Sequence, residues 1–327
     1  MNSAAAHVVA VDLGGTNAQI ALIDPDYQVL EQTKIPTDAN AGAETVVERI
    51  AEGIRHVLGA AGNVRVSGVG IGAPGPLDPE TGVVAFAPNL GWHNVALKQM
   101  LESRLKLPVY VENDVNVGTL GELRLGAGKG VSDLVGVFVG TGIGGGIVIG
   151  GKLHRGYNDS GGEVGHMVVK RGGPRCGCGN RGCWEALASR TAINRRLLKA
   201  KQEERPSALW PEGDDEPLRI RSKALRKALA AGDPLVTREM KRCARYLGIG
   251  AANLINILSP EMIVFGGGVV EAMEDWLVPR IRSHAKDYAL EQSMQNVKIV
   301  PAQLGDDAGI LGCAVMARDR ISTATGK

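Results

Sequence analysis

The chain lacks a long hydrophobic segment, an excess of charge of either sign, and more than a few cysteines. No apolar run reaches the length of a bilayer span without a glycine or a charged residue. The first residues, MNSAAAHVVAVDLGG, contain no basic segment and run directly into a glycine turn, so we do not expect a signal peptide. The 37 basic and 35 acidic residues nearly cancel, which gives no indication of a nucleic-acid or membrane partner.

The few cysteines argue against a protein held together by disulfides. There are five in 327 residues, and three of them lie between positions 176 and 183. The other two, Cys243 and Cys313, lie in apolar segments that are predicted to be helical. This usage favours a reducing, cytoplasmic location. The length and the hydrophobic content of 44% indicate a soluble globular protein, more readily of two domains than of one.

Two common nucleotide-binding motifs are absent. Gly140, Gly142 and Gly145 match the spacing of a dinucleotide fingerprint, but the β-branched run at 147–149 follows them where that fold needs a helix. No P-loop sequence occurs anywhere in the chain. If the chain binds ATP, it must therefore use other glycine-rich turns.

Two predicted strand hairpins carry such turns. Apolar runs at 7–12 and 18–23 surround a turn at 13–16, and runs at 134–139 and 147–149 surround a turn at 141–144. Amide groups in glycine turns can approach a phosphate closely, although a tight hairpin needs glycine for conformational reasons alone. A third glycine turn follows a strand at 262–265. The repeated pattern suggests two related halves.

Hydrophobic periodicity predicts a mixed α/β protein. Helices are predicted at 44–58, 94–105, 186–199 and 234–258, and from 308 to the C-terminal region. Strands are predicted at 64–71, 109–112 and 297–301. A polar insertion separates two of the helices at 202–218, and the basic segment at 219–227 is predicted to be a solvated helix.

Carboxylates stand at the ends of two predicted strands. Asn113 and Asp114 follow the strand at 109–112, where an Asn-Asp pair can position a hydroxyl group and accept its proton. Taken alone, the pair is better explained by an ordinary Asx turn or helix cap. Asp12 precedes the first glycine turn, where it can hold a hydrated magnesium ion next to phosphates or simply cap the turn.

The most specific pattern is a metal-ligand set. Cys176, Cys178 and Cys183, with His166 ten residues before the first of them, supply the three thiolates and one imidazole of a closed zinc site. Free thiols or redox chemistry are the alternatives. Four protein ligands leave no open position for catalysis, so the zinc is expected to be structural. Acidic residues flank the set at Glu163 and Glu185, where they can accept hydrogen bonds from sugar hydroxyls.

Taken in order, the segments DLGGTN, GAPGPLD, END, GTGIGGG, GGEVGH, CGCGNRGCWE and IVFGGG resemble the ROK family (repressor, open reading frame, kinase), and above all its bacterial glucokinase-like members. The resemblance implies an actin-like ATPase fold of hexokinase type, with two ribonuclease-H-like α/β domains and a cleft between them. It assigns residues 1–117 and 306–327 to a small domain, and residues 118–305 to a large domain that carries the zinc loop and the nucleotide site.

The resemblance also implies roles for particular residues. Asp114 is the expected catalytic base. The expected sugar-binding residues are Asn89, Asn113, Asp114, Glu163, His166 and Glu185. The expected nucleotide-binding residues are Asp12, which assists Mg²⁺, with Gly14, Gly15, Thr16, Asn17, Thr141, Gly142, Gly266, Gly267 and Gly268. The expected zinc ligands are His166, Cys176, Cys178 and Cys183.

We therefore predict a cytoplasmic, homodimeric kinase that transfers phosphate from ATP with Mg²⁺ to a hexose, with glucose as the first choice. Mannose, N-acetylglucosamine, N-acetylmannosamine, fructose or allose, and polyphosphate as the donor, are the alternatives within this class. A non-catalytic, sugar-sensing regulator is the alternative from another class; it would need a DNA-binding domain before the first strand, and we expect no room for one. Two departures from the family pattern are Arg190, where many relatives carry glycine, and the insertion at 202–218.

Overall fold

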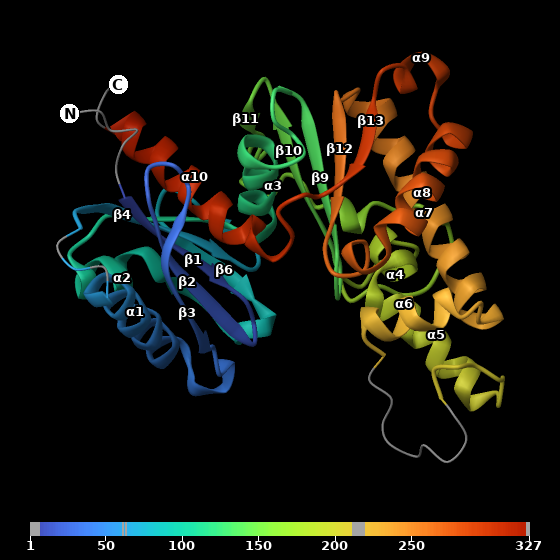
Figure 1. Cartoon of the computed structure of the whole chain (residues 1–327), viewed down its shortest axis with the longest axis horizontal. Coiled ribbons are helices and arrows are strands. Elements are labelled where there is room, and N and C mark those ends of the chain that lie inside the picture. The colour runs from blue at the N-terminus through green and yellow to red at the C-terminus, as the bar shows by residue number, and fades with distance from the viewer. Residues whose placement is uncertain (1–6, 61, 63, 211–219, 325–327) are drawn as a thin grey trace.

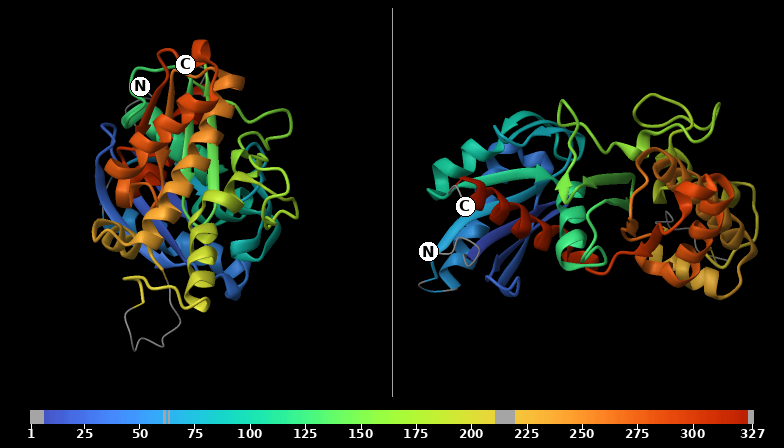
Figure 2. Two further views of the ribbon diagram at one scale, coloured as in Figure 1. Left: turned by 90° about the vertical axis from the view of Figure 1, so that its right-hand side faces the viewer. Right: turned by 90° about the horizontal axis from the view of Figure 1, so that it is seen from above.

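A computed structural model describes residues 7–60, 62, 64–210 and 220–324 of the chain. Two α/β lobes lie side by side and are joined by two crossing helices, α3 (Asp114–Leu125) and α10 (Ala308–Ala324) (Figure 1). The view from above separates the two lobes most clearly (Figure 2). Among the described helices, none combines the length and the apolar character that crossing a membrane requires.

The first lobe is built on a five-stranded sheet in the order β3-β2-β1-β4-β8. Alternate residues of β1 face opposite sides: Val9 and Val11 pack toward the outer helices, whereas Val8 and Ala10 pack toward α10 and α3. Its four central residues, 8–11, are therefore all apolar, as expected for a strand that is buried on both faces. The elements of this sheet and its outer helices are β1 (His7–Leu13), β2 (Asn17–Ile23), β3 (Val29–Pro36), α1 (Ala43–Ala60), β4 (Val66–Ala73), α2 (Leu97–Leu105) and β8 (Val109–Asn113).

The second lobe repeats this topology with the order β11-β10-β9-β12-β13. In each sheet, three strands that follow one another in the sequence form antiparallel pairs, β1 to β3 in the first sheet and β9 to β11 in the second. Two further strands then add in parallel on the other side of β1 and of β9. This agreement confirms the two related halves that the hairpin turns predicted. The strands are β9 (Leu134–Val139), β10 (Ile143–Ile149), β11 (Lys152–Leu153), β12 (Met262–Gly266) and β13 (Lys298–Pro301), and the helices are α4 (Trp184–Ala188), α5 (Arg190–Gln202), α6 (Ser222–Ala230), α7 (Pro234–Leu258), α8 (Glu274–Tyr288) and α9 (Glu291–Met294).

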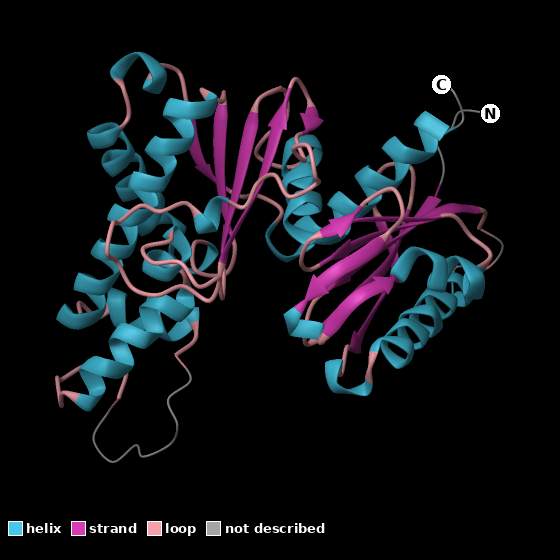
Figure 3. Cartoon of the chain, turned by 180° about the vertical axis from the view of Figure 1, so that it is seen from behind, coloured by secondary structure: helices cyan, strands magenta, loops and turns pink. Residues whose placement is uncertain are grey.

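Helices α3 and α10 occupy the space between the two sheets (Figure 3). Their apolar residues pack with Val8 of the first sheet and with Leu134 and Val264 of the second in one continuous core. The two helices approach closely because glycine stands at the crossing. A Cβ atom on Gly312 would overlap the carbonyl oxygen of Val117, and one on Gly121 would lie 2.6 Å from the carbonyl oxygen of Ala308.

Several sequence-based boundaries need correction. The predicted helix at 94–105 begins only at Leu97, because residues 92–96 form strand β7 (Trp92–Ala96) in a small sheet with β5 (Leu77–Asp78) and β6 (Val83–Ala87). The predicted helix at 186–199 is divided at Ser189, whose side chain accepts a hydrogen bond from the amide of Ala192 and so starts α5. Strand β3 was not predicted. Residues 211–219 of the predicted insertion lie outside the described residues.

Candidate active site

A cavity of about 670 Å³ opens between the two lobes, at the carboxyl ends of the parallel strands. Both lobes contribute to its walls, so it is the cleft that the two-domain prediction requires. Eight of the residues predicted for the site line it: Asn89, Asn113, Asp114, Gly142, Glu163, His166, Glu185 and Gly267. The other predicted residues lie outside its lining: Asp12, Gly14, Gly15, Thr16, Asn17, Thr141, Gly266, Gly268, Cys176, Cys178 and Cys183.

Asp114 is the first residue of α3, and Asn113 caps that helix. The side-chain oxygen of Asn113 accepts hydrogen bonds from the amides of Val115 (2.9 Å) and Asn116 (3.2 Å), while its amide nitrogen donates to the carbonyl oxygen of Gly75. Asn113 is therefore a helix cap, which was the alternative explanation of the Asn-Asp pair, and this cap fixes the position of Asp114 at the cleft. Burial, together with the negative charges of Asp12 and Glu163, raises the pKa of Asp114 to about 7.

Asp12 lies behind Asp114, at the start of α10. A Cβ atom on Gly309 would lie 2.5 Å from Oδ2 of Asp12, so only glycine lets this carboxylate reach the helix N-terminus. Burial raises the pKa of Asp12, and the negative charge of Asp306 raises it further. The carboxylates of Asp114 and Asp306 thus lie close to Asp12, and such a group of carboxylates is favourable for a divalent cation.

The first glycine turn, residues 13–16, lies beside the predicted sugar-binding Asn89. A Cβ atom on Gly15 would approach Cβ of Asn89 to 3.0 Å. Thr37 supports the turn: its amide donates to the carbonyl of Thr16 (2.9 Å) and its hydroxyl donates to that of Gly14 (2.8 Å). Sequence reasoning did not identify Thr37, because two strands, β2 and β3, separate it from the turn.

The second glycine turn was predicted at 141–144 but occupies residues 140–142, because β10 already begins at Ile143; it lies against Glu185. The carboxylate of Glu185 accepts a hydrogen bond from the amide of Ile143 (3.1 Å), and a Cβ atom on Gly142 would overlap it. Arg190 belongs to the same corner, since its guanidinium donates to the hydroxyl of Thr141 at 2.7 Å. The departure from the family pattern at Arg190 thus places a positive charge directly on the turn that is predicted to bind phosphate.

Glu112 is a buried carboxylate that sequence reasoning missed. One oxygen accepts hydrogen bonds from the amide of Asn113 (3.0 Å) and the side chain of Asn116 (2.9 Å), and the other receives the guanidinium of Arg155 at 2.6 Å. Arg155 begins the loop that leads to Glu163. This ion pair therefore fixes the strand end that presents Asp114 to the loop that presents a predicted sugar ligand.

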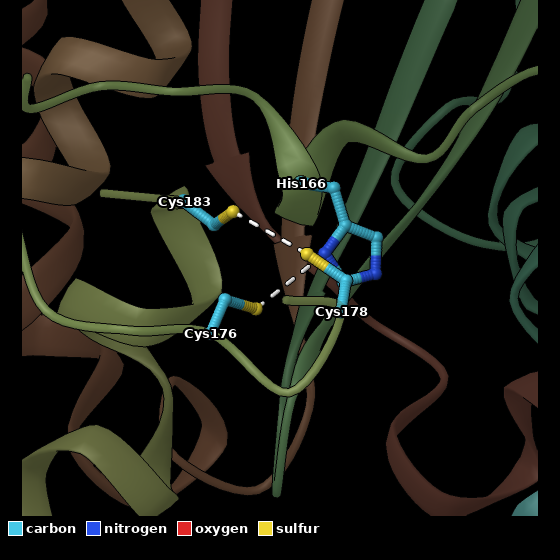
Figure 4. Close-up of side chains that lie close together, drawn as sticks. All are labelled: His166, Cys176, Cys178 and Cys183. Carbon is cyan, nitrogen blue, oxygen red and sulfur yellow. Dashed lines mark hydrogen bonds between the residues drawn. The ribbon is translucent and has the colours of Figure 1, made fainter. Parts of the chain in front are cut away.

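The four predicted zinc ligands meet at one point, with their side chains turned toward one another (Figure 4). Their ligand atoms all lie within 4.8 Å of one another. Sγ of Cys178 is 3.7 Å from Sγ of Cys183, and Sγ of Cys176 is 3.7 Å from Nδ1 of His166. Sulfur and nitrogen ligands at usual zinc distances are separated by about 3.5 to 3.8 Å in a tetrahedron. The donor atoms and these separations fit a zinc ion.

The cluster lies directly behind the cleft. Nδ1 of His166 faces the cysteines, whereas Nε2 lies 3.8 Å from Oε2 of Glu163. Sγ of Cys176 lies 3.7 Å from Oε1 of Glu185. The cluster thus has a predicted sugar-binding carboxylate on each side, as the sequence spacing suggested.

The family model for ROK proteins matches residues 8–320. This chain belongs to the ROK family. It is 39% identical to a glucokinase of Thermotoga maritima over 96% of this chain and 98% of that protein. The solved structure of a ROK family glucokinase from Streptomyces griseus, in complex with glucose and AMPPNP, matches with a TM-score of 0.82 and 35% identity over 96% of this chain and 99% of that one.

The ROK family also contains regulators. A xylose repressor of Caldicellulosiruptor bescii is 36% identical over 77% of this chain and 62% of the repressor.

The structural likeness to ROK kinases confirms the predicted actin-like ATPase fold for this ROK protein.

The Glu112–Arg155 pair gives a test of how the cleft is held together. We expect Arg155→Met to lower the free energy of unfolding by about 2 kcal/mol, because it leaves a buried carboxylate without its cation. The loop ahead of Glu163 also loses its anchor, so the Michaelis constant for sugar should rise about tenfold, while kcat falls less. Urea unfolding and steady-state kinetics measure both effects.

Arg49→Met is the matched control, since Arg49 forms a surface ion pair with Asp38 at 3.1 Å. That variant should change stability by less than about 1 kcal/mol and leave the kinetics unaltered. If both variants changed the free energy of unfolding and the Michaelis constant by the same amounts, Arg155 would have no positioning role.

Proposed function

We propose that this ROK protein transfers the γ-phosphate of ATP to a hydroxyl group of glucose and so forms glucose 6-phosphate. The observation that carries the proposal is the position of Asp114. It starts α3 and lines the cleft together with the predicted sugar-binding side chains, close to Asp12, and its pKa of about 7 suits a general base near neutral pH. The similarity to proteins named glucokinase supports the same activity.

In the proposed reaction, Asp114 removes the proton of the attacking sugar hydroxyl as that oxygen approaches the γ-phosphorus. Phosphoryl transfer requires mainly positioning and charge neutralisation from a protein. A neighbouring cation on Asp12 would lower the pKa of Asp114 and favour its ionised form. The base is therefore expected to become effective when sugar and nucleotide are both bound.

The sugar is proposed to lie between Asn89 and Asn113 on the first lobe and Glu163, His166 and Glu185 on the second. Carboxylates accept hydrogen bonds from hydroxyl groups, and the Asn113 amide and His166 Nε2 complement them. Because both lobes contribute ligands, sugar binding would draw the lobes together and exclude water from the transferring phosphate.

The nucleotide phosphates are proposed to bind at the two glycine turns. Amide groups in glycine turns suit phosphate oxygens, and Arg190 adds a cation beside Thr141. Asp12 would hold Mg²⁺ through water, with the ion neutralising charge on the β- and γ-phosphates. The proposed nucleotide residues remain Gly14, Gly15, Thr16, Asn17, Thr141, Gly142, Gly266, Gly267 and Gly268.

A structural Zn²⁺ is proposed for His166, Cys176, Cys178 and Cys183. Only one ring nitrogen of His166 faces the cysteines, so the other is free to contact sugar. We also propose a cytoplasmic homodimer, with the domain division at 1–117 plus 306–327 and 118–305.

The similarity to a xylose repressor favours one second candidate, a sugar-sensing regulator. Such a protein needs the sugar-binding side chains but no base with a tuned pKa. Retention of a buried, ionisable Asp114 between the predicted sugar and phosphate sites therefore supports the kinase over the regulator.

A release assay for ADP tests the proposed function. With ATP and excess Mg²⁺, glucose should give the highest kcat/KM among glucose, mannose, N-acetylglucosamine, N-acetylmannosamine, fructose and allose. Polyphosphate replaces ATP in a parallel series, with glucose 6-phosphate measured directly. Absence of turnover with every sugar and both donors, combined with sequence-specific DNA binding at physiological salt, would establish the regulator instead.

Asp114→Asn tests the proposed base. We expect kcat to fall by about 10³-fold with a change of less than about threefold in glucose affinity, because the amide keeps the shape but cannot accept the proton. Wild-type kcat/KM should decline below about pH 7, as the carboxylate becomes protonated. Near-normal turnover in the variant would exclude the assigned role.

The same variant makes a stability prediction. In the folded protein Asp114 binds its proton more tightly than its ordinary pKa of 3.8 allows, so wild-type stability decreases as pH rises from about 4 to 7. Asp114→Asn lacks this penalty and should be more stable than wild type at pH 8, by on the order of 2 kcal/mol. At pH 4 the difference should disappear, which urea unfolding at both values can measure.

Removal of zinc tests the metal cluster. A chelated, verified zinc-free protein should melt at a lower temperature and bind glucose at least about tenfold more weakly, since the same loop holds His166 and Glu185. Adding Zn²⁺ back should restore both properties. Unchanged glucose affinity in the zinc-free protein would mean that the cluster supports the fold alone.

A further inference from the structure

A second hollow, of about 620 Å³, lies outside the cleft on the second lobe. None of its lining residues lines the active-site cavity. Five cationic side chains dominate it, and we call it the basic hollow; its lining residues are Lys170, Lys241, Arg242, Arg245, Tyr246, Arg280 and His284. The chain as a whole has a net charge of only +2, so this concentration of positive charge is local.

Three segments build the basic hollow. Helix α7 supplies a single stripe, because its four lining residues occur at positions 241, 242, 245 and 246. Helix α8 supplies Arg280 and His284, which are one turn apart. The two helices pack closely, since a Cβ atom on Gly248 would overlap that of His284. Lys170 comes from the loop between the zinc ligands.

The charges of the basic hollow are not neutralised. No acidic residue lines it, and among the described residues none of its five lysines and arginines forms an ion pair. His284 alone meets a carboxylate, with Nδ1 3.2 Å from Asp287. Side by side, such cations repel one another, and an anion in the hollow would relieve that repulsion.

Neutral groups hold two of the guanidiniums in place. Arg245 donates to the phenol oxygen of Tyr288 at 3.1 Å. Arg280 lies 3.9 Å above the ring of Trp276 and donates to the carbonyl oxygen of that residue at 2.7 Å. These contacts orient the planar groups but leave their full charge available. A pre-oriented guanidinium matches phosphate oxygens well and loses little entropy on binding them.

We propose that the basic hollow is a binding site for an oligophosphate, the linear chain of phosphates shared by inorganic polyphosphate and nucleoside triphosphates. Its volume accommodates a compact ligand, and its charges require a multivalent anion. Helices α7 and α8 and the loop that carries Lys170 meet there, so a bound oligophosphate would contact all three. The amide of Lys170 donates a hydrogen bond to the carbonyl of Gly182 at 3.3 Å, which links the bound oligophosphate to the residue before Cys183.

Calorimetry on the full chain tests the proposal with inorganic tripolyphosphate as the probe. The protein is first saturated with glucose and AMPPNP, so that the phosphate site of the cleft is occupied, and Mg²⁺ is in excess at fixed ionic strength. We expect a one-to-one binding event. A second titration with GTP distinguishes the nucleotide source from the inorganic one, and binding of either oligophosphate at this site supports the proposal.

The decisive variant is Lys241→Gln with Arg242→Gln, which changes two exposed residues of the hollow that do not line the cleft. Affinity for tripolyphosphate should fall about tenfold or more, since two charge-assisted contacts are removed. Lys223→Gln with Arg226→Gln on α6 is the matched control, because it removes the same charge from a surface outside the hollow. That control should bind as wild type does, and both variants should keep wild-type kcat and circular dichroism.

Several outcomes would overturn the proposal. Binding that disappears when the cleft is saturated would belong to the active site, and equal weakening in both double variants would be unspecific attraction. An acidic peptide that binds the hollow while tripolyphosphate does not would identify a protein partner instead. A change from dimer to monomer in the decisive variant alone, measured by light scattering, would show that a second copy covers the hollow.

Discussion

The close crossing of α3 and α10 is the contact on which the active site depends. Gly121 and Gly312 allow the two backbones to touch between the sheets, so that the N-terminal end of α3 reaches the cleft and that of α10 lies against Asp12. Asp114 begins one helix, and Asp12 lies against Gly309 near the start of the other. A larger residue at the crossing would separate the sheets and move both carboxylates. The joint between the lobes and the proposed catalytic base are therefore parts of one packing arrangement.

Negative charge at this joint determines the chemistry of the cleft. Asp12 and Glu163 raise the pKa of Asp114, while Glu112 remains paired with Arg155 and positions the residues beside it. An anionic cleft attracts a divalent cation and sugar hydroxyls but repels phosphate by itself. In the proposed complex, the amides of the glycine turns, Arg190 and Mg²⁺ would supply the compensating positive charge. A base with a raised pKa thus follows from the same crowding of carboxylates that favours a metal-bound nucleotide.

The loop that contains the proposed zinc ligands, residues 166–183, joins two different surfaces of the second lobe. On the cleft side it presents His166 and is followed by Glu185, and on the outer side it contributes Lys170 to the basic hollow. The ring of Trp184 packs against α7, where a Cβ atom on Gly250 would overlap it. Glycine at that position lets the loop sit directly on the helix that carries most of the hollow. A short segment that carries four proposed metal ligands is well suited to such a connection, because a bound ion would fix its backbone without a core of its own.

The sequence by itself determined the features that depend on local pattern. The two hairpins, the helix at 234–258, the zinc ligands and the Asn-Asp pair all lie within short segments whose spacing carries the signal. The tertiary structure decided what depends on distant residues. Strand β3 is half polar and has no buried residue, so only its pairing with β2 makes it a strand. Glu112 meets Arg155, Thr37 supports the first turn, and Lys170 joins Arg242 and Arg280 only after folding. Packing brings these residues together from separate elements, and no periodicity in the chain records that proximity.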